Sequence, residues 1–192
     1  MLAAQARYGR HLALSGVDGL SLGRYLYPLL PEDAFDHGPV WRDNMYLAAD
    51  VRLDNREELG AALDIAPSSI ARFSDAMLLF ECLMRWGQAA TARLVGEFAF
   101  AFWNGAEQTL ILARDYLGFR PLYFHRGADF FAFSSMPSGL HAIPEIPYDF
   151  DAEEITRKLA LIARHGRKSF FREIERVEPA TMLIVTPSDI HT

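Results

Sequence analysis

The stretch LILARDYLGFRPLYF, residues 110–124, joins two apolar runs through a charged turn that carries a single glycine. The first run is aliphatic and the second is rich in aromatic residues, and both compositions are typical of buried β-strands. The sequence therefore predicts strands over residues 110–114 and 121–125 around a turn at 115–118. We expect the two strands to pack in the core as a hairpin.

The stretch just before it, EFAFAFW at residues 97–103, predicts a strand that is apolar on both faces. Successive side chains of a strand point to opposite faces of its sheet. One face carries Phe98, Phe100 and Phe102, and the other carries Ala99, Ala101 and Trp103. Such a strand must be covered on both sides, so we expect helices over one face and helices or a second sheet over the other.

Further strands are predicted at residues 46–53, 129–134 and 182–186, and the closely spaced strands from 97 to 134 predict an antiparallel meander. Helices are predicted at residues 2–14, 56–63, 75–86 and 152–163. Asn55 with Glu58 resembles a capping box for the second of these helices. Ser74 and Gly87 bound the third helix, whose Glu81 and Arg85 are spaced as a solvent-facing pair.

Composition limits the possible functions. The chain has 192 residues, of which 51% are hydrophobic and 23% charged, so we expect one globular domain over residues 1–192. A net charge of -6 argues against nucleic acid or an anionic membrane as a partner. The chain shows no secretory signal and no apolar run long enough to cross a bilayer. It contains a single cysteine. We therefore expect a soluble cytoplasmic protein.

Common catalytic motifs are missing from the sequence. The six histidines do not occur at a ligand spacing such as HExxH, and there is no GxSxG, Walker or GxGxxG motif. We therefore expect no metal site. Cys82 lies mid-helix among apolar residues, so we interpret it as a small buried hydrophobic side chain rather than a nucleophile.

The order of several short segments is more informative than any one of them. They are NREEL (55–59), FSDAMLL (73–79), RWG (85–87), GEFAFAFW (96–103), LARDYLGFRPLYF (112–124), FFAFSS (130–135) and FREIERVEPATMLIV (171–185). In this order and spacing they closely resemble the amino-terminal glutaminase domain of asparagine synthetases, a class II glutamine amidotransferase. The resemblance runs from about Leu22 to residue 192.

The resemblance implies an α+β fold, the four-layer αββα sandwich of N-terminal-nucleophile (Ntn) hydrolases, built from antiparallel sheets. In active relatives the chain begins with a cysteine whose thiol attacks the side-chain amide of glutamine, and ammonia passes to an ATP-using synthetase domain. Here residue one is Met1, so no catalytic residue is expected. Either the true start lies upstream, or the first strand of the family is lacking.

The segment DVRLDN, residues 50–55, stands where the family has NGEIYN. Asp50 replaces the asparagine of the oxyanion hole, so an anion takes the place of a hydrogen-bond donor. Val51 replaces a glycine that allows close backbone approach, and Arg52 replaces a glutamate expected near the substrate amine.

Two other positions complete the expected pocket. The family's carboxylate-binding arginine has become Tyr25 or Leu26, with only Arg24 nearby. Asp75 matches the amine-binding aspartate, although an acid in the first turn after Ser74 would equally stabilise the helix dipole. We therefore expect a degenerate glutamine pocket at Asp75, Asp50, Val51, Arg52 and Arg24.

Two functions are compatible with these residues. One is a catalytically silent glutaminase-like domain, a structural and docking module of an asparagine-synthetase-type ligase such as a lasso-peptide cyclase, which has a precursor peptide as a further partner. The other is an active glutamine hydrolase whose initiating cysteine is missing from this chain. In both, no cofactor is expected in this domain; ATP and Mg²⁺ would bind the synthetase domain of the same polypeptide, which this chain does not contain.

Overall fold

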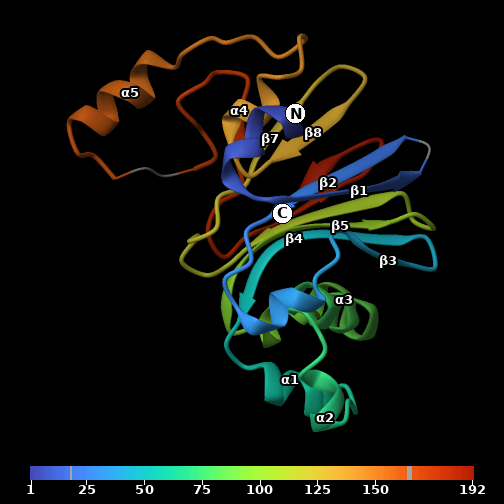
Figure 1. Ribbon diagram of the computed structural model, residues 1–192. Coiled ribbons are helices and arrows are strands. Elements are labelled where there is room, and N and C mark those ends of the chain that lie inside the picture. The colour runs from blue at the N-terminus through green and yellow to red at the C-terminus, as the bar shows by residue number, and fades with distance from the viewer. Residues whose placement is uncertain (18, 164–165) are drawn as a thin grey trace.

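A computed structural model describes residues 1–17, 19–163 and 166–192. Within these residues the largest sheet has six antiparallel strands, and helices cover one of its faces while further strands cover the other (Figure 1). In sheet order the strands are β11 (Ile190–His191), β10 (Met182–Val185), β6 (Thr109–Arg114), β5 (Gly96–Asn104), β4 (Met45–Leu53) and β3 (Val40–Arg42). The predicted strands at 46–53, 97–103 and 182–186 are confirmed.

The helical layer packs on the phenylalanine face of β5. It consists of α1 (Arg56–Ala62), α2 (Pro67–Ile70), α3 (Asp75–Trp86) and the 3-10 helix η3 (Gly87–Arg93). As predicted, the Ser74 hydroxyl caps α3 by accepting from the Met77 N–H at 3.1 Å, and Gly87 ends the helix with a φ of 55°. Phe98, Phe100 and Phe102 form one core cluster with α3. Burying each such side chain is worth about 2 to 3 kcal/mol.

The opposite face of β5 packs against the second layer of strands. This layer contains the hairpin of β1 (His11–Val17) and β2 (Leu20–Leu26) and a sheet in the order β8 (Phe131–Ser134), β7 (Tyr123–Arg126), β9 (Glu175–Arg176). Ala99 and Ala101 of β5 share a core cluster with Leu112, Phe124 and Leu183. The prediction that β5 is covered on both sides is therefore confirmed.

The outermost layer and the connections are helical. They are η1 (Leu2–Tyr8), η2 (Pro31–Phe35), α4 (Pro137–Leu140) and α5 (Ala152–Leu159), of which α5 stands clear of the body (Figure 1). The layer order helix, sheet, sheet, helix is the expected αββα arrangement. None of the helices in the described part of the chain combines the length and apolar character needed to cross a bilayer.

The predicted hairpin at residues 110–125 is wrong, and so is the meander. β6 belongs to the six-stranded sheet and β7 to the three-stranded sheet, so residues 115–122 cross from one layer to the other. The crossing is stabilised by Asp115, whose carboxylate is 1% exposed and accepts backbone N–H groups of Phe98, Leu117, Phe119 and Arg120. These bonds replace the ladder hydrogen bonds that a crossing backbone lacks.

Arg114 supports the crossing from the other side. Its guanidinium donates to the backbone carbonyls of Gly118, Arg120 and Val177. Gly118 has a φ of 66°, and a Cβ there would lie 2.8 Å from Arg114 Nη2, so the turn requires glycine on both counts. The charged turn of the opening stretch is therefore a connection between layers.

Other predictions differ in detail. The predicted helix at residues 2–14 is the shorter η1, followed by β1, and α5 ends at Leu159 rather than 163. Asn55 does not cap α1; its amide binds the Arg93 carbonyl and its oxygen accepts the Val95 N–H. Long-range backbone partners take precedence over the local cap at this position.

The predicted pair of Glu81 with Arg85 is also replaced by a longer-range contact. Glu81 accepts two hydrogen bonds from Arg42 of β3, at 2.8 and 2.9 Å. This bidentate geometry joins α3 to the edge of the sheet, which a pair within one helix could not do.

Candidate functional site

Three charged side chains form a ladder at the end of β4 and β5. Asp50 lies on the face of β4 directed toward the second layer, opposite Ala99. Arg120 reaches Asp50 with Nη1 and Glu97 with Nη2, each at 3.3 Å. The layer crossing positions Arg120 beside these strands, because the Arg120 N–H donates a hydrogen bond to the buried Asp115 carboxylate. Asp50 therefore presents a carboxylate held by a cation and offers no hydrogen-bond donor.

Arg52 extends the ladder, whereas Val51 does not belong to it. Arg52 lies opposite Glu97, and its Nη2 donates to both Asp54 oxygens at 2.9 and 3.1 Å. The hydrogen bond to Asp54 raises the pKa of Arg52. Val51 points to the other side of the sheet and packs against the helix-side core. Of the DVR triplet, the structure therefore brings only Asp50 and Arg52 to one face.

Asp75 is closed off from any cavity. It is 3% exposed, its Oδ2 accepts the Leu53 N–H at 2.9 Å, and its Oδ1 pairs with Arg56. Burial raises the pKa of Asp75, and the Leu53 amide and Arg56 offset part of that effect. Arg56 also donates to the carbonyls of Ile70 and Phe73. Asp75 thus joins β4, α1 and α3, and no ligand can reach its oxygens in this arrangement.

Arg24 lies in a third place, on β2. Its Nη1 donates to both oxygens of Asp36, at 2.8 and 2.7 Å, and both side chains are largely buried. The pair forms part of a cavity of about 210 Å³ with His11, Leu26 and His37 among its lining residues. The other four residues predicted for the pocket do not line this cavity. The predicted residues therefore do not line one cavity: Asp50 and Arg52 lie in the ladder, Val51 and Asp75 lie on the helix side of β4, and Arg24 lies beside the cavity on β2.

Sequence reasoning missed two members of the ladder, Glu97 and Arg120. Glu97 opens the predicted strand EFAFAFW, and Arg120 follows Gly118 in the predicted hairpin. A strand predicted to be apolar on both faces that opens with a glutamate was the available signal for Glu97. Arg120 could not be placed near Asp50 while residues 110–124 were interpreted as a hairpin.

Metal-ligating groups and the lone cysteine complete the candidate residues. No group of three or more His, Cys, Asp or Glu side chains in the described ranges is arranged to hold a metal ion. Cys82 is fully buried in α3, and burial raises its pKa to about 12. Its thiol is therefore protonated at neutral pH and packs as an apolar group, in agreement with the interpretation of the sequence.

A family model described as "Glutamine amidotransferase domain" matches residues 39–192. The chain belongs to this family. Asparagine synthetase [glutamine-hydrolyzing] 3 of Bacillus subtilis (strain 168) is 29% identical over 132 residues, which cover 68% of this glutamine amidotransferase domain and 22% of that protein. Asparagine synthetase [glutamine-hydrolyzing] 1 of the same organism is 25% identical over 133 residues, covering 69% and 21%.

Solved structures support the fold of the glutamine amidotransferase domain. The glutamine phosphoribosylpyrophosphate amidotransferase of B. subtilis, complexed with ADP and GMP, superposes with a TM-score of 0.56 at 20% identity, covering 89% of this chain and 34% of that one. An allosteric regulatory enzyme of purine biosynthesis gives 0.57 at 19% identity, covering 88% and 34%. At these identities the likeness shows the Ntn-hydrolase type of fold alone.

Proposed function

We propose that this amidotransferase domain is catalytically degenerate and serves as a structural and docking module of an ATP-dependent ligase of the asparagine synthetase type. The ion pair of Asp50 with Arg120 is the observation that carries the proposal. An oxyanion needs donors preorganised toward it, and losing one donor costs about a hundred- to a thousand-fold in rate. Asp50 supplies no donor at that position, and its carboxylate is already paired with Arg120.

The other glutamine-recognition positions support the same proposal. Asp75 is bonded to Arg56 and the Leu53 amide, so its carboxylate is not available to a substrate amine. Arg24 is bonded to Asp36, so its charge is already neutralised. Neither end of a glutamine molecule would find a free partner of opposite charge among these residues.

A ligase that takes its nitrogen from a peptide has no need of glutamine. We propose a reaction of the lasso-peptide cyclase kind, in which ATP activates a side-chain carboxylate and the peptide's own amino terminus displaces the leaving group to form an isopeptide bond. ATP, Mg²⁺ and the precursor peptide would bind a synthetase domain of the same polypeptide. The chain spans about a fifth of the length of its curated relatives, which leaves room for such a domain in them. The proposed setting is the cytoplasm, with no nucleic-acid or membrane partner.

Glutamate release by the natural full-length polypeptide tests the proposal. We expect no release above background from glutamine, with or without added ATP and Mg²⁺. The variant Asp50→Asn, Val51→Gly, Arg52→Glu should also stay inactive, because Asp75 and Arg24 remain neutralised. Turnover of glutamine by the unaltered protein would overturn the proposal.

The alternative is an active hydrolase that has lost its initiating cysteine from this chain. It is favoured by the names of the two curated relatives, both described as glutamine-hydrolyzing. An in-frame cysteine upstream in the coding DNA, followed by a short apolar strand, would support it. The same glutamate assay on the extended protein decides between the two functions.

A further inference from the structure

Residues 147–163 leave the body and form α5, and residues 166–173 lie back beside the point where this segment begins (Figure 1). Its base is closed by backbone hydrogen bonds, from Asp151 to the Phe170 carbonyl at 2.9 Å and from Arg172 to the Asp149 carbonyl at 3.0 Å. Stacked aromatic rings brace the same place, with Phe150 and Phe171 at 5.3 Å between centroids. We call this segment the arm; its base is held by these hydrogen bonds and ring contacts.

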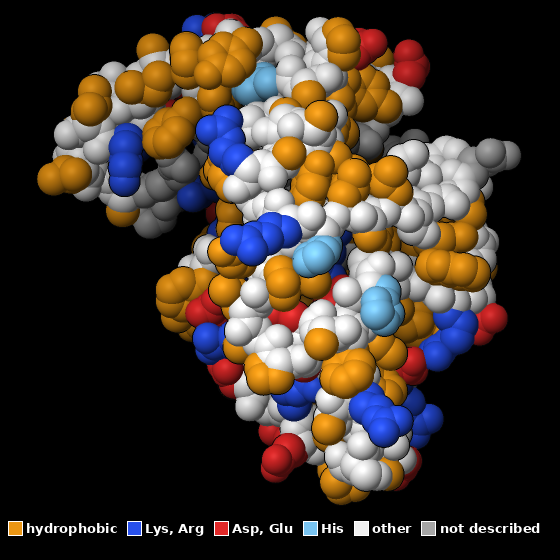
Figure 2. Space-filling view, in the orientation of Figure 1, with side chains coloured by type: hydrophobic (Ala, Val, Ile, Leu, Met, Phe, Trp, Pro, Cys, Tyr) orange, Lys and Arg blue, Asp and Glu red, His pale blue; other side chains and the backbone are white. Residues whose placement is uncertain are grey.

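The helix of the arm buries an acidic side chain and exposes an apolar one, which is the reverse of what a free surface helix does. Glu154 is 6% exposed, whereas Leu159 is 80% exposed. Directly after the helix, Leu161 is 88% exposed, and Ile162 is also exposed. Hydrophobic side chains gather on the arm in Figure 2. A helix normally buries its apolar face, so this surface indicates a missing neighbour.

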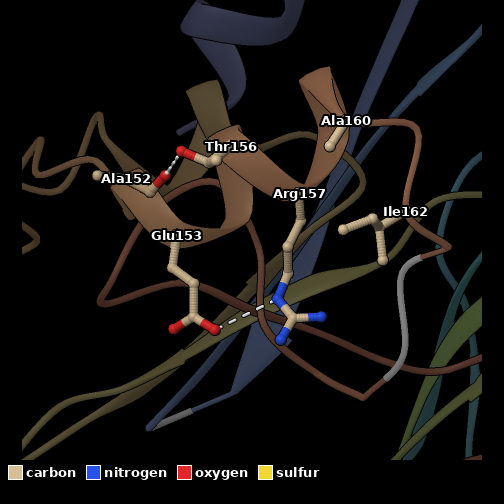
Figure 3. Close-up of a pocket in the computed structure, with 6 residues that line it drawn as sticks. All are labelled: Ala152, Glu153, Thr156, Arg157, Ala160 and Ile162. Atoms are coloured by element: carbon tan, nitrogen blue, oxygen red, sulfur yellow. Dashed lines mark hydrogen bonds and ion pairs between the residues drawn. The ribbon is translucent and has the colours of Figure 1, made fainter.

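A hollow in the arm makes the surface concave. It is a shallow hollow of about 450 Å³, widely open to solvent, and is lined by Ala152, Glu153, Thr156, Arg157, Ala160 and Ile162. Figure 3 shows Glu153 and Arg157 paired along one side, at 3.2 Å, while Ala160 and Ile162 provide an apolar side. The Thr156 hydroxyl is already bound to the Ala152 carbonyl at 2.7 Å, so little polar capacity is left for a small polar ligand. The hollow is better suited to an apolar side chain.

The charge of the arm restricts the partner further. Its outer part carries Arg157, Lys158, Arg167 and Lys168, together with the acidic residues Glu153 and Glu154 on the same helix as Arg157 and Lys158. Glu153 pairs with Arg157 and with Lys168, at 3.2 and 3.4 Å. Among the described residues, the ion pairs of this helix join Glu153 and Glu154 to Arg157, and Glu153 to Lys168, and leave Lys158 outside them. Because Arg157 and Lys168 are already paired within the arm, a matching surface would be mainly apolar, with a carboxylate placed near Lys158.

We propose that the arm is the docking element for the ligase-type domain of the same polypeptide. This inference rests on the proposed function, which requires such a domain. The occupant is favoured by chain length, because the curated relatives extend over about five times the matched stretch. A covalently linked neighbour also has a high effective concentration, so a surface of a few apolar residues is enough to hold it.

Hydrogen exchange in the natural full-length polypeptide tests the docking. The pair Leu159→Glu with Leu161→Glu should speed amide exchange in α5 about tenfold or more, because burial of these leucines by the neighbour is lost. Exchange in α3 should not change, which shows that the domain remains folded. The control pair, Leu29→Glu with Leu117→Glu, changes two other exposed leucines and should leave α5 unaffected.

Zero-length cross-linking identifies the occupant in the same protein. We expect Lys158 to couple to a carboxylate of the ligase-type domain. Coupling between isotopically labelled and unlabelled molecules would assign the surface to a second copy, and sedimentation with anionic vesicles to a lipid surface; either result overturns the inference. So would unchanged α5 exchange in the leucine variant. These readouts do not depend on glutamine hydrolysis, so failure of the docking and failure of the proposed function are distinguishable.

Discussion

The layer crossing and the ladder at the end of β4 both depend on charged residues, but they use them differently. In the crossing, Asp115 is buried and bonds to backbone amides. In the ladder, Asp50 has a side chain that is 52% exposed and bonds to another side chain. Charges that satisfy the backbone are part of the fold, whereas charges that satisfy each other can be exchanged without unfolding it. A family can therefore keep its sandwich while its pocket changes.

Removing the crossing's carboxylate should have the largest effect. Asp115→Ala leaves the backbone N–H groups of Phe98, Phe119 and Arg120 without their acceptor, and we expect a loss of about 4 kcal/mol in the free energy of unfolding. Urea unfolding followed by fluorescence measures it. Glu107→Ala, in the exposed turn between β5 and β6, should change stability by less than about 0.5 kcal/mol. If both variants lost the same free energy of unfolding, Asp115 would have no special role in stabilising the crossing.

Breaking the pair beneath α3 should come next. Arg56→Ala leaves Asp75 buried without its cation and frees the carbonyls of Ile70 and Phe73, so we expect a loss of about 3 kcal/mol. Arg72→Ala on the exposed surface is the matched control and should be near neutral. If Arg56→Ala were equally mild, Asp75 would not have the structural role assigned to it and would again be a candidate for ligand binding.

Acid should weaken the crossing specifically. Burial alone would raise the pKa of Asp115, but the amides of Phe119, Arg120 and Phe98 outweigh it and lower the pKa below its ordinary value. The carboxylate therefore stabilises the fold above the ordinary aspartate pKa of about 3.9, and this contribution is lost as pH falls through the folded value. The stability advantage of the unaltered protein over Asp115→Asn should shrink below about pH 4 in chemical denaturation. An advantage independent of pH between 7 and 3 would contradict the assignment.

Sequence pattern was sufficient for the elements whose periodicity is strong. The alternation in β5 predicted that both of its faces are covered, and Ser74 with Gly87 predicted the limits of α3. The hairpin failed because two apolar strands around a short charged turn look the same whether they pair or diverge. The difference lies in buried side-chain bonds to the backbone, such as those of Asp115, and these have no signature in strand propensity.

The relative placement of the candidate site residues could be predicted only within one strand. Asp50 and Arg52 do share a face, as their spacing requires. Val51 points away for the same reason, because a strand alternates. The neutralisation of Asp75 by Arg56 and of Arg24 by Asp36 depends on contacts 19 and 12 residues apart in sequence. Such pairs are fixed by tertiary packing, which a single sequence without its fold does not reveal.

The ladder itself should show the smallest effect. Arg120→Ala and Asp50→Asn should each cost less than about 1 kcal/mol, and the double-mutant cycle should give a coupling of about 0.5 kcal/mol, because both side chains are partly hydrated. The coupling should also fall when salt is raised from 0.05 to 0.5 M, roughly the range over which screening of exposed charges becomes strong. A coupling of several kcal/mol that resists salt would show that the ladder is buried in the natural protein, covered by a neighbour. In that case the charges of the ladder, like Asp115 in the crossing, would contribute substantially to stability.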